Sequence, residues 1–426
     1  MSSRAEALEE ALENVVVFAG KDDEDYVDDV CNILHITRGE LSERRYHSDS
    51  DPYLRILQEV GGKDVFFVSR YHKRTTETLF EMLNFANAAL HEGANSVNVF
   101  ETYLGCSRQE RRSKPGEAVT LQVKAQCILA NGISTFSTFA AHAPATILGF
   151  DPGNTKFKDV PLWPPMIQVI SNTAGEDAKI KSVGPDAGSA KFVRDILDST
   201  TVEEDDRFSA DLAIVDKDRV HQENGQTKSG AIIGDVENVI ASIFDDESVS
   251  GATICDAARI CREAGAIGAY VALAHPKFAM DDEGTKRIKD ALKERIIEKL
   301  VISNSCYLPP DFHRKLGLEE DSNRLVILPT QPLVAEYIIR SANTKGVPYL
   351  FSSRGVLKAY DNIAQRVRNA EQKERRDDHK EEYEENFRQE LDIYNRMARP
   401  VLGPYQPIVR SHVKLAGCQK GVKNPK

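Results

Sequence analysis

The chain has 426 residues, of which 41% are hydrophobic and 28% charged, and its formal net charge is −11. This length and composition indicate a globular protein of two or three domains, and the acidic balance argues against a general nucleic-acid-binding protein. Seven cysteines without Cys-x-x-Cys spacing favour neither a disulfide framework nor a zinc site. Because there is no apolar signal core and no run long enough to cross a membrane, the sequence predicts a cytoplasmic protein.

Short β-branched runs alternate with helical patterns along most of the chain, which predicts parallel sheets covered by helices on both faces. The predicted strands are Val15–Phe18, Asp64–Val68, Ser96–Phe100, Ile133–Phe136, Ile180–Val183, Asp211–Val215, Val239–Phe244, Ala269–Ala274, Leu300–Ser303 and Leu325–Leu328. The predicted helices are Thr75–Ala94, Ala118–Asn131, Ser189–Asp198, Gly251–Ala264, Thr285–Arg295 and Leu333–Ala342.

These strands are too many for one compact sheet. The Pro-rich segment from Asp151 to Pro165 is the best candidate for a linker between two similar α/β halves. The predicted organisation is an N-terminal helix over 1–14, α/β domains over 15–160 and 161–353, and a charged helical extension over 354–426.

In that extension, four apolar residues fall on one face of the predicted helix at i, i+4, i+8 and i+11. They are Tyr383, Phe387, Leu391 and Tyr394. A stripe of this kind is most often a packing or subunit-contact face.

The most informative segment is a β-branched run that ends in two carboxylates and turns through small hydroxyl residues into a helix. The strand delivers Asp245 and Asp246 to its carboxyl end, where open α/β sheets bind ligands. Ser250, Gly251 and Thr253 fall at the start of an amphipathic helix, whose free N–H groups and positive dipole end suit a phosphate monoester. The segment favours a ribose-phosphate site. Taken alone, an acidic turn that caps a helix is the simpler interpretation.

Two further segments place cations after predicted strands. Arg108 and Gln109 follow the third strand, where a guanidinium can bind phosphate oxygens in pairs and a glutamine can hold a purine edge or a sugar. Lys217 and Arg219 precede a polar loop, His221 to Ser229, which suits closure over a reacting phosphate. Each segment alone is more often a solvated charge run.

Two single residues complete the candidate site. Asp186 lies in a turn between a strand and a helix, where a carboxylate suits a metal ion or a sugar, or simply caps the helix. His142 lies where an apolar strand exits into a loop. A lone histidine in apolar surroundings is usually a core residue.

Taken together and in their order along the chain, the five features resemble ribose-phosphate diphosphokinase, also called phosphoribosyl pyrophosphate synthetase, from about residue 15 to residue 351. The resemblance implies two tandem phosphoribosyltransferase-like domains, each a mostly parallel sheet flanked by helices, plus the helical C-terminal extension. The matching segments are Arg108-Gln109, His142, Pro185-Asp186-Ala187-Gly188, Lys217 with Arg219, Asp245 to Thr253, Tyr349-Leu350-Phe351 and, near the N-terminus, His47 to Asp51.

The resemblance implies transfer of a diphosphoryl group from Mg-ATP to the anomeric hydroxyl of ribose 5-phosphate, giving phosphoribosyl pyrophosphate and AMP. It also implies a homo-oligomer, either a dimer or a hexamer, with an adenine pocket shared between subunits and no nucleic-acid or membrane partner. The implied roles are catalysis for Lys217 and Arg219; ATP binding for Arg108, Gln109, His142, Asp49 and Asp51; ribose-phosphate binding for Asp245, Asp246, Ser250, Gly251 and Thr253; and Mg²⁺ binding for His142 and Asp186.

The chain departs from the family pattern at Ala140, where the family has an Asp beside the metal-binding His, and at Val249 and Ala252 in the phosphate turn. Two alternatives therefore stay open: the same chemistry on a larger ribosyl phosphate, or a non-catalytic regulatory subunit of a synthetase assembly. Retention of Lys217 argues against the second, and the lost acid argues for it. A phosphoribosyltransferase acting on a base would share the acidic turn but would not need the two cation pairs.

Overall fold

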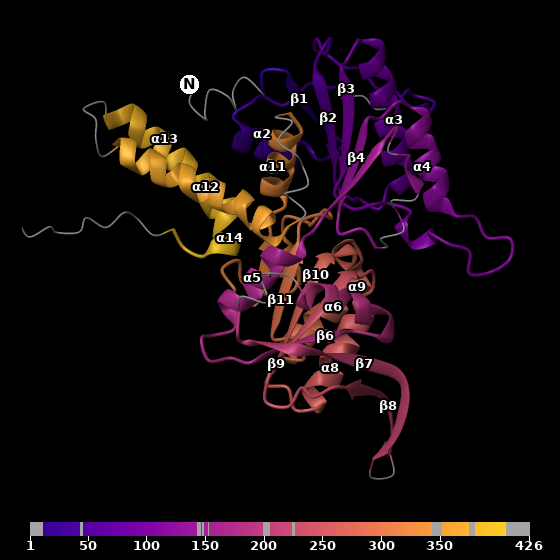
Figure 1. The fold of residues 1–426 in the computed structure, drawn as a ribbon, viewed down its shortest axis with the longest axis vertical. Helices are drawn as coiled ribbons and strands as arrows, with labels where there is room; N and C mark the ends of the chain where they lie inside the picture. Colours follow the sequence, from indigo (N-terminus) through magenta and orange to yellow (C-terminus); the bar gives the residue numbers. More distant parts are fainter. Residues whose placement is uncertain are drawn as a thin grey trace, which may run out of the picture.

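The computed structural model describes residues 12–42, 46–142, 146, 149–151, 153–198, 205–223, 226–342, 352–374 and 380–405. Two sheets with their covering helices lie one beyond the other along the long axis of the molecule, and a helical hairpin projects from one side (Figure 1). Within the described residues, no helix is both long and apolar enough to span a bilayer. The predicted N-terminal helix lies almost entirely outside the described part.

The first sheet has five parallel strands whose spatial order follows the sequence. They are β1 (Val15–Ala19), β2 (Asp64–Ser69), β3 (Ser96–Glu101), β4 (Thr135–Phe139) and β5 (Lys156–Val160). Every residue of β1 is buried, as expected for a parallel strand covered on both faces. The covering helices are α3 (Thr75–His91) and α4 (Thr120–Ala130) on one face and α2 (Glu24–Leu34) on the other.

The second sheet has seven strands in the order β12-β11-β10-β9-β6-β7-β8, and only the β7–β8 pair is antiparallel. The strands are β6 (Ile180–Gly184), β7 (Phe208–Glu223), β8 (Gln226–Ile233), β9 (Ile240–Glu247), β10 (Gly268–His275), β11 (Lys299–Ser303) and β12 (Leu325–Leu328). The covering helices are α8 (Ala252–Glu263) and α9 (Asp282–Lys293) on one face and α5 (Trp163–Thr173) and α6 (Ala190–Leu197) on the other.

All ten predicted strands and all six predicted helices are present, with shifted ends. The predicted linker is wrong, because its residues form β5 and the first turn of α5. Pro164 and Pro165 occupy that first turn, where the missing N–H has no partner to lose. The predicted polar loop is also wrong, since its described residues belong to the β7–β8 hairpin. Helix α2 was not predicted.

The C-terminal extension is helical, as predicted, over its described residues. α12 (Ser353–Glu374) and α13 (Lys380–Ile393) form the projecting hairpin, and a π-turn leads from α13 into α14 (Arg399–Leu402) (Figure 1). Phe387, Leu391 and Tyr394 pack into the main hydrophobic core, so the apolar stripe is a packing face within the chain. The side chain of Tyr383 and the segment 349–351 lie outside the described part.

Contacts far apart in sequence fix the two sheets to one another. Helix α11 (Gln331–Ala342) follows the second sheet in sequence but packs against α2 of the first (Figure 1). The hydroxyls of Tyr26 and Thr330 lie 2.7 Å apart in the buried interface, and Ser137 donates a 2.7 Å hydrogen bond to the hydroxyl of Tyr337. Because these groups are buried and mutually satisfied, sliding the sheets apart would leave them without partners.

We expect Arg366→Ala to lower the free energy of unfolding by about 1–3 kcal/mol, because Arg366 ties the hairpin to the body. Its guanidinium donates to the carbonyl of Ile33 and, at 2.8 Å, to Glu390, whose side chain is only 9% exposed. Arg368→Ala is the matched control. Within the described residues, the hydrogen bonds of the Arg368 side chain go to Gln365 in its own helix, so this change should alter stability by less than about 0.5 kcal/mol. Urea unfolding measures both variants, and equal losses would contradict the prediction.

Candidate functional site

The candidate site lies at the carboxyl edge of the second sheet. The chain reverses its direction of progress between β6 and β9, and ligands bind open α/β sheets at such a switch point. Asp186 follows β6, and Asp245 to Glu247 end β9. The order of the strands therefore brings two of the predicted acidic segments to one crevice.

A histidine from the first domain reaches this acidic turn. His142, just beyond β4, lies with its Nδ1 2.6 Å from Oδ2 of Asp246. The backbone N–H of Ala141 donates at 3.0 Å to Oδ1 of Asp159 in β5, which holds the segment that carries the histidine. The structure thus brings together two of the predicted site residues, His142 and Asp246, although 104 residues separate them.

The two aspartates of the turn have pKa values shifted in opposite directions. Burial raises the pKa of Asp245 well above its usual range, and the charges of Asp246 and Asp186 add to the shift. Burial opposes ionisation of Asp246 as well and is the largest single influence, but the hydrogen bond and charge of His142, together with His275 and the backbone N–H of Glu247, outweigh it and lower the pKa of Asp246. The hydrogen bond with Asp246 raises the pKa of His142. Adjacent carboxyl groups with divergent pKa values supply a proton donor and an acceptor side by side.

The next residue, Glu247, joins the two domains through three partners. Its Oε1 lies 3.2 Å from Nε of Arg108, and its Oε2 accepts a 2.6 Å hydrogen bond from the hydroxyl of Tyr103. Lys277, just after β10, contacts the same Oε2 at 3.3 Å and donates to the Tyr103 hydroxyl at 2.8 Å. Tyr103 and Arg108 both follow β3 in the first domain. One buried carboxylate therefore organises cations from both domains.

A buried ion pair supports the segment that carries Arg108. Lys124 and Glu101 are both almost fully buried, with Nζ 2.5 Å from Oε2, and Glu101 also accepts the backbone N–H of Gly105. An added Cβ at Gly105 would lie 2.4 Å from a methyl group of Thr75, so no larger residue fits there without movement. Arg108 and Gln109 follow in a single 3₁₀ turn, which keeps them close to this anchor.

The predicted phosphate turn begins α8. Gly251 is its N-cap residue with φ +73°, a conformation that favours glycine, and an added Cβ would lie 2.9 Å from Cδ1 of Ile288. Ser248 accepts the N–H of Gly251 at 3.1 Å, and Ser250 accepts that of Ala252 at 3.4 Å. Thr253 lies in the first turn of the helix. The turn lies at a helix N-terminus, as predicted. The backbone N–H groups of Gly251 and Ala252 are already hydrogen-bonded within the turn.

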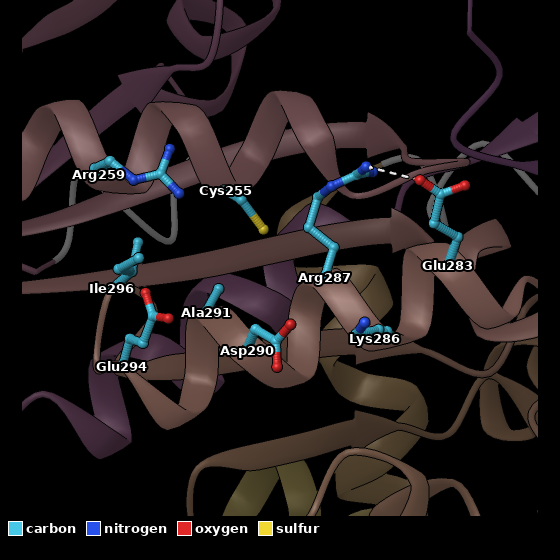
Figure 2. A pocket seen from close by; sticks show the side chains of 9 residues that line it. All are labelled: Cys255, Arg259, Glu283, Lys286, Arg287, Asp290, Ala291, Glu294 and Ile296. Atoms are coloured by element: carbon cyan, nitrogen blue, oxygen red, sulfur yellow. Dashed lines mark hydrogen bonds and ion pairs between the residues drawn. The ribbon is translucent and has the colours of Figure 1, made fainter.

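A groove of about 300 Å³ lies between α8 and α9, next to this turn (Figure 2). Arg287 projects from α9 across the groove, and its Nη1 donates to the carbonyl of Ser250 at 2.5 Å while its Nη2 pairs with Glu283. Three cations and three carboxylates line the groove, so their formal charges balance. In this structure Arg287 therefore holds the backbone of the phosphate turn.

Asp186 serves as a helix cap in this structure. Its Oδ1 accepts the N–H of Ser189 at 3.0 Å, and the Ser189 hydroxyl bonds back to the backbone of Asp186. Of the two roles considered from the sequence, a ligand for a metal ion or sugar and a helix cap, these contacts match the cap. Among the described residues, no group of three or more His, Cys, Asp or Glu side chains is arranged to hold a metal ion. A Mg²⁺ ion that arrives with nucleotide phosphates needs only one or two protein ligands.

The remaining predicted residues are placed by their backbone. Val183 of β6 pairs with Ala213 of β7 and with Ile243 of β9, so Ala213 and Ile243 lie level in the sheet. Three residues further along each strand, Asp216 is then level with Asp246. The backbone of Lys217 therefore lies at the same edge of the sheet as the acidic turn. The side chains of Lys217 and Arg219 lie outside the described part.

Asp49 and Asp51 occupy an exposed turn between the paired residues Tyr46 and Pro52. In the described part of the chain, no hydrogen bond or ion pair joins either aspartate to the acidic turn. The structure therefore does not bring them to the site within one chain.

Sequence reasoning missed Glu247, Lys277 and Tyr103. Glu247 directly follows Asp245 and Asp246 in the acidic turn. An acidic residue at the end of a buried strand indicates that a cation lies nearby. Lys277 offered no local signal, because a lysine after a strand is usually solvated. Its pairing with Glu247 follows only from the alignment of β9 with β10, where His275 lies opposite Glu247.

A family model and two relatives with the same name match this chain. Residues 15–132 match the family model described as the N-terminal domain of ribose phosphate pyrophosphokinase. A ribose-phosphate pyrophosphokinase of Fusobacterium nucleatum is 26% identical over 339 residues, which are 80% of this chain and 98% of that protein. One of Bacillus subtilis has the same identity and the same coverage.

A solved structure shows the same fold. The crystal structure of phosphoribosylpyrophosphate synthetase from Mycobacterium smegmatis covers 78% of this chain and all of that chain, with a TM-score of 0.65 and 20% sequence identity. This match confirms the predicted fold class of two α/β units flanked by helices.

The carboxylate of Asp159, which accepts the N–H of Ala141 next to His142, should make the free energy of unfolding fall as pH rises. Burial raises the pKa of Asp159 from its usual value of 3.8 to about 6. Between about pH 4 and pH 6 the folded protein then binds more protons than the unfolded chain, so stability is lost as pH increases through this window. Asp159→Asn keeps an oxygen for the N–H of Ala141, and we expect a gain of up to about 3 kcal/mol near pH 8 but little change near pH 4. Urea unfolding at several pH values measures this, and a gain that does not depend on pH would refute it.

Proposed function

Because the chain belongs to the ribose-phosphate pyrophosphokinase family, we propose that it transfers the diphosphoryl group of ATP to the anomeric hydroxyl of ribose 5-phosphate. In this reaction the anomeric oxygen forms a bond to the β-phosphorus, the bond from that phosphorus to the oxygen of the α-phosphate breaks, and AMP leaves. The products are AMP and phosphoribosyl pyrophosphate.

The observation that carries the proposal is the convergence of both domains on the acidic turn. His142 contacts Asp246 and Arg108 contacts Glu247, while the backbone of Lys217 lies at the same sheet edge. A sugar phosphate on the turn and a nucleotide held by the residues after β3 and β4 would then meet in one crevice. Holding two reactants in place supplies much of the catalysis in phosphoryl transfer, which needs little covalent help from protein.

The acidic turn suits the acceptor. Asp245 and Asp246 provide a donor and an acceptor for the two ribose hydroxyls, because their pKa values are shifted apart. Ser250, Gly251 and Thr253 receive the 5-phosphate at the positive end of α8. The acceptor is thereby held at both ends, with its anomeric carbon directed toward the first domain.

The first domain suits the nucleotide. We assign Arg108 and Gln109 to ATP, and His142 with Asp186 to the Mg²⁺ that accompanies it. The ion would neutralise phosphate charge when bound. Lys217 and Arg219 are assigned to the transferring group. Asp49 and Asp51 are exposed, and within the described residues neither bonds to the acidic turn, so we assign them to the adenine of a neighbouring copy in a homo-oligomer.

One observation favours a different acceptor. Val249 lies in the phosphate turn with 37% of its surface exposed, where it offers an apolar contact that ribose 5-phosphate does not need. A larger ribosyl phosphate could cover this surface. The chemistry and the roles above would otherwise stay the same.

Purified protein with ATP, Mg²⁺ and ribose 5-phosphate should release AMP. We expect Lys217→Ala to lower kcat on the order of 10²–10³-fold, as removal of one charge-stabilising donor does in other enzymes. Lys191→Ala is the control, because Lys191 is exposed and pairs only with Asp195 in its own helix. Bulkier ribosyl phosphates run in parallel identify the acceptor. Folded protein that releases no AMP with any acceptor would support the non-catalytic subunit instead.

A further inference from the structure

A pocket of about 270 Å³ lies beside the acidic turn and is lined from both domains. Among the described residues, its charged lining residues are Arg108 and Lys277, and no carboxylate lines it. Thr75, Thr120 and Gln109 add neutral polar groups. The volume is about nine times the ~30 Å³ that one water molecule occupies in the liquid. A pocket of this size with two cations and neutral hydrogen-bonding groups suits an anionic ligand.

Within the described residues, Lys277 has one hydrogen-bond donor left for such a ligand. Its side chain is only 7% exposed, and an ammonium group carries three donors. One donor goes to the hydroxyl of Tyr103 and one to Glu247. The ammonium also lies 4.4 Å from the centre of the Tyr103 ring and 5.1 Å from that of Tyr71, two rings that stabilise a cation where water is scarce.

Glu247 does not cancel the charge of the pocket. Its carboxylate is 8% exposed and lies behind the pocket rather than in its lining. It carries one negative charge, whereas Arg108 and Lys277 together carry two positive charges. Tyr103 donates to the same carboxylate, and burial together with the charge of Glu247 raises the pKa of this tyrosine, which keeps the hydroxyl protonated. The network therefore retains one net positive charge facing the pocket.

We infer that Lys277 binds the phosphate chain of the nucleotide and that Glu247 is the positioning residue that holds Lys277 and Arg108 around it. The carboxylate fixes the two cations on its two oxygens, so both are in place before the ligand arrives. Lys277 projects from the second domain, and Arg108 from the first. The phosphate chain is thus held between the domains, next to the turn that holds the sugar.

This inference rests on the proposed function, because it takes ATP as the ligand. ATP carries two more phosphate groups than AMP. A lysine that binds the phosphate chain should therefore contribute more to the affinity for ATP than to that for AMP.

The test compares Lys277→Met with wild-type protein by titration calorimetry, using ATP with Mg²⁺ and AMP as separate ligands and no ribose 5-phosphate. We expect the dissociation constant of ATP to rise about 10- to 100-fold, and that of AMP by less than about 3-fold. Lys277→Arg should retain most of the affinity. In turnover, Lys277→Met should raise the KM for ATP and leave the KM for ribose 5-phosphate unchanged.

Lys299→Met is the matched control. Lys299 is also buried and lies 5.7 Å from a tyrosine ring, that of Tyr270, but it begins β11 at the opposite edge of the same sheet. Its removal should leave the affinity for ATP unchanged. If Lys299→Met loses as much affinity for ATP as Lys277→Met, the loss comes from removing any buried lysine and not from the position of Lys277 in the pocket.

A double variant separates phosphate binding from structural support. Glu247→Gln combined with Lys277→Met removes both charges, so no buried carboxylate remains without its lysine. If Lys277 serves only to neutralise Glu247, the double variant recovers the wild-type affinity for ATP. If Lys277 binds phosphate, the affinity stays low while the fold, measured by urea unfolding, is retained.

The outcomes distinguish the inference from the function it rests on. Wild-type protein that binds ATP and releases AMP, together with unchanged ATP affinity in Lys277→Met, would overturn the inference alone. Equal losses for ATP and AMP would also overturn it, because the phosphate chain would not be the contact. Wild-type protein that binds no ATP would overturn both the inference and the proposed function.

Discussion

The site depends on buried carboxylates at the end of one strand whose partners come from both domains. Asp246 and Glu247 end a strand of the second sheet. His142, Arg108 and Tyr103, which contact them, follow strands of the first sheet, and Lys277 of the second domain also contacts Glu247. Removing a partner of a buried carboxylate is unfavourable, so the second domain alone would leave Asp246 without His142 and Glu247 with Lys277 as its cation. Docking of the two domains and assembly of the site are therefore the same event.

A second set of contacts that dock the domains lies away from the crevice. Helix α11 returns from the second sheet to pack on α2, and the Tyr26–Thr330 and Ser137–Tyr337 hydrogen bonds are buried between the two units. The C-terminal hairpin then packs on the same region through α12 and the π-turn. Stability is supplied by apolar and neutral polar contacts there, which leaves the crevice free to hold charges close together.

Charge in this protein is arranged locally. The chain has a net charge of −11, yet Arg108 and Lys277 line a pocket that contains no carboxylate. The nearby carboxylates are engaged instead: Glu247 holds the two cations, Glu101 holds Lys124, and Asp186 caps a turn. A low local dielectric strengthens each of these interactions, so a few placed cations can bind a polyanion in an acidic molecule.

The sequence by itself determined the buried strands, most helices and the residues that surround the crevice. Strands such as Val15–Ala19 are apolar throughout because both faces are covered, and that pattern is readable locally. β5 and β8 escaped notice because each lies at the edge of its sheet and carries polar residues. Only the tertiary structure decided that Glu247 pairs with Lys277 and that Arg108 reaches the same carboxylate. The physical reason is that both contacts depend on which strands and domains become neighbours, and no local pattern of residue types records that choice.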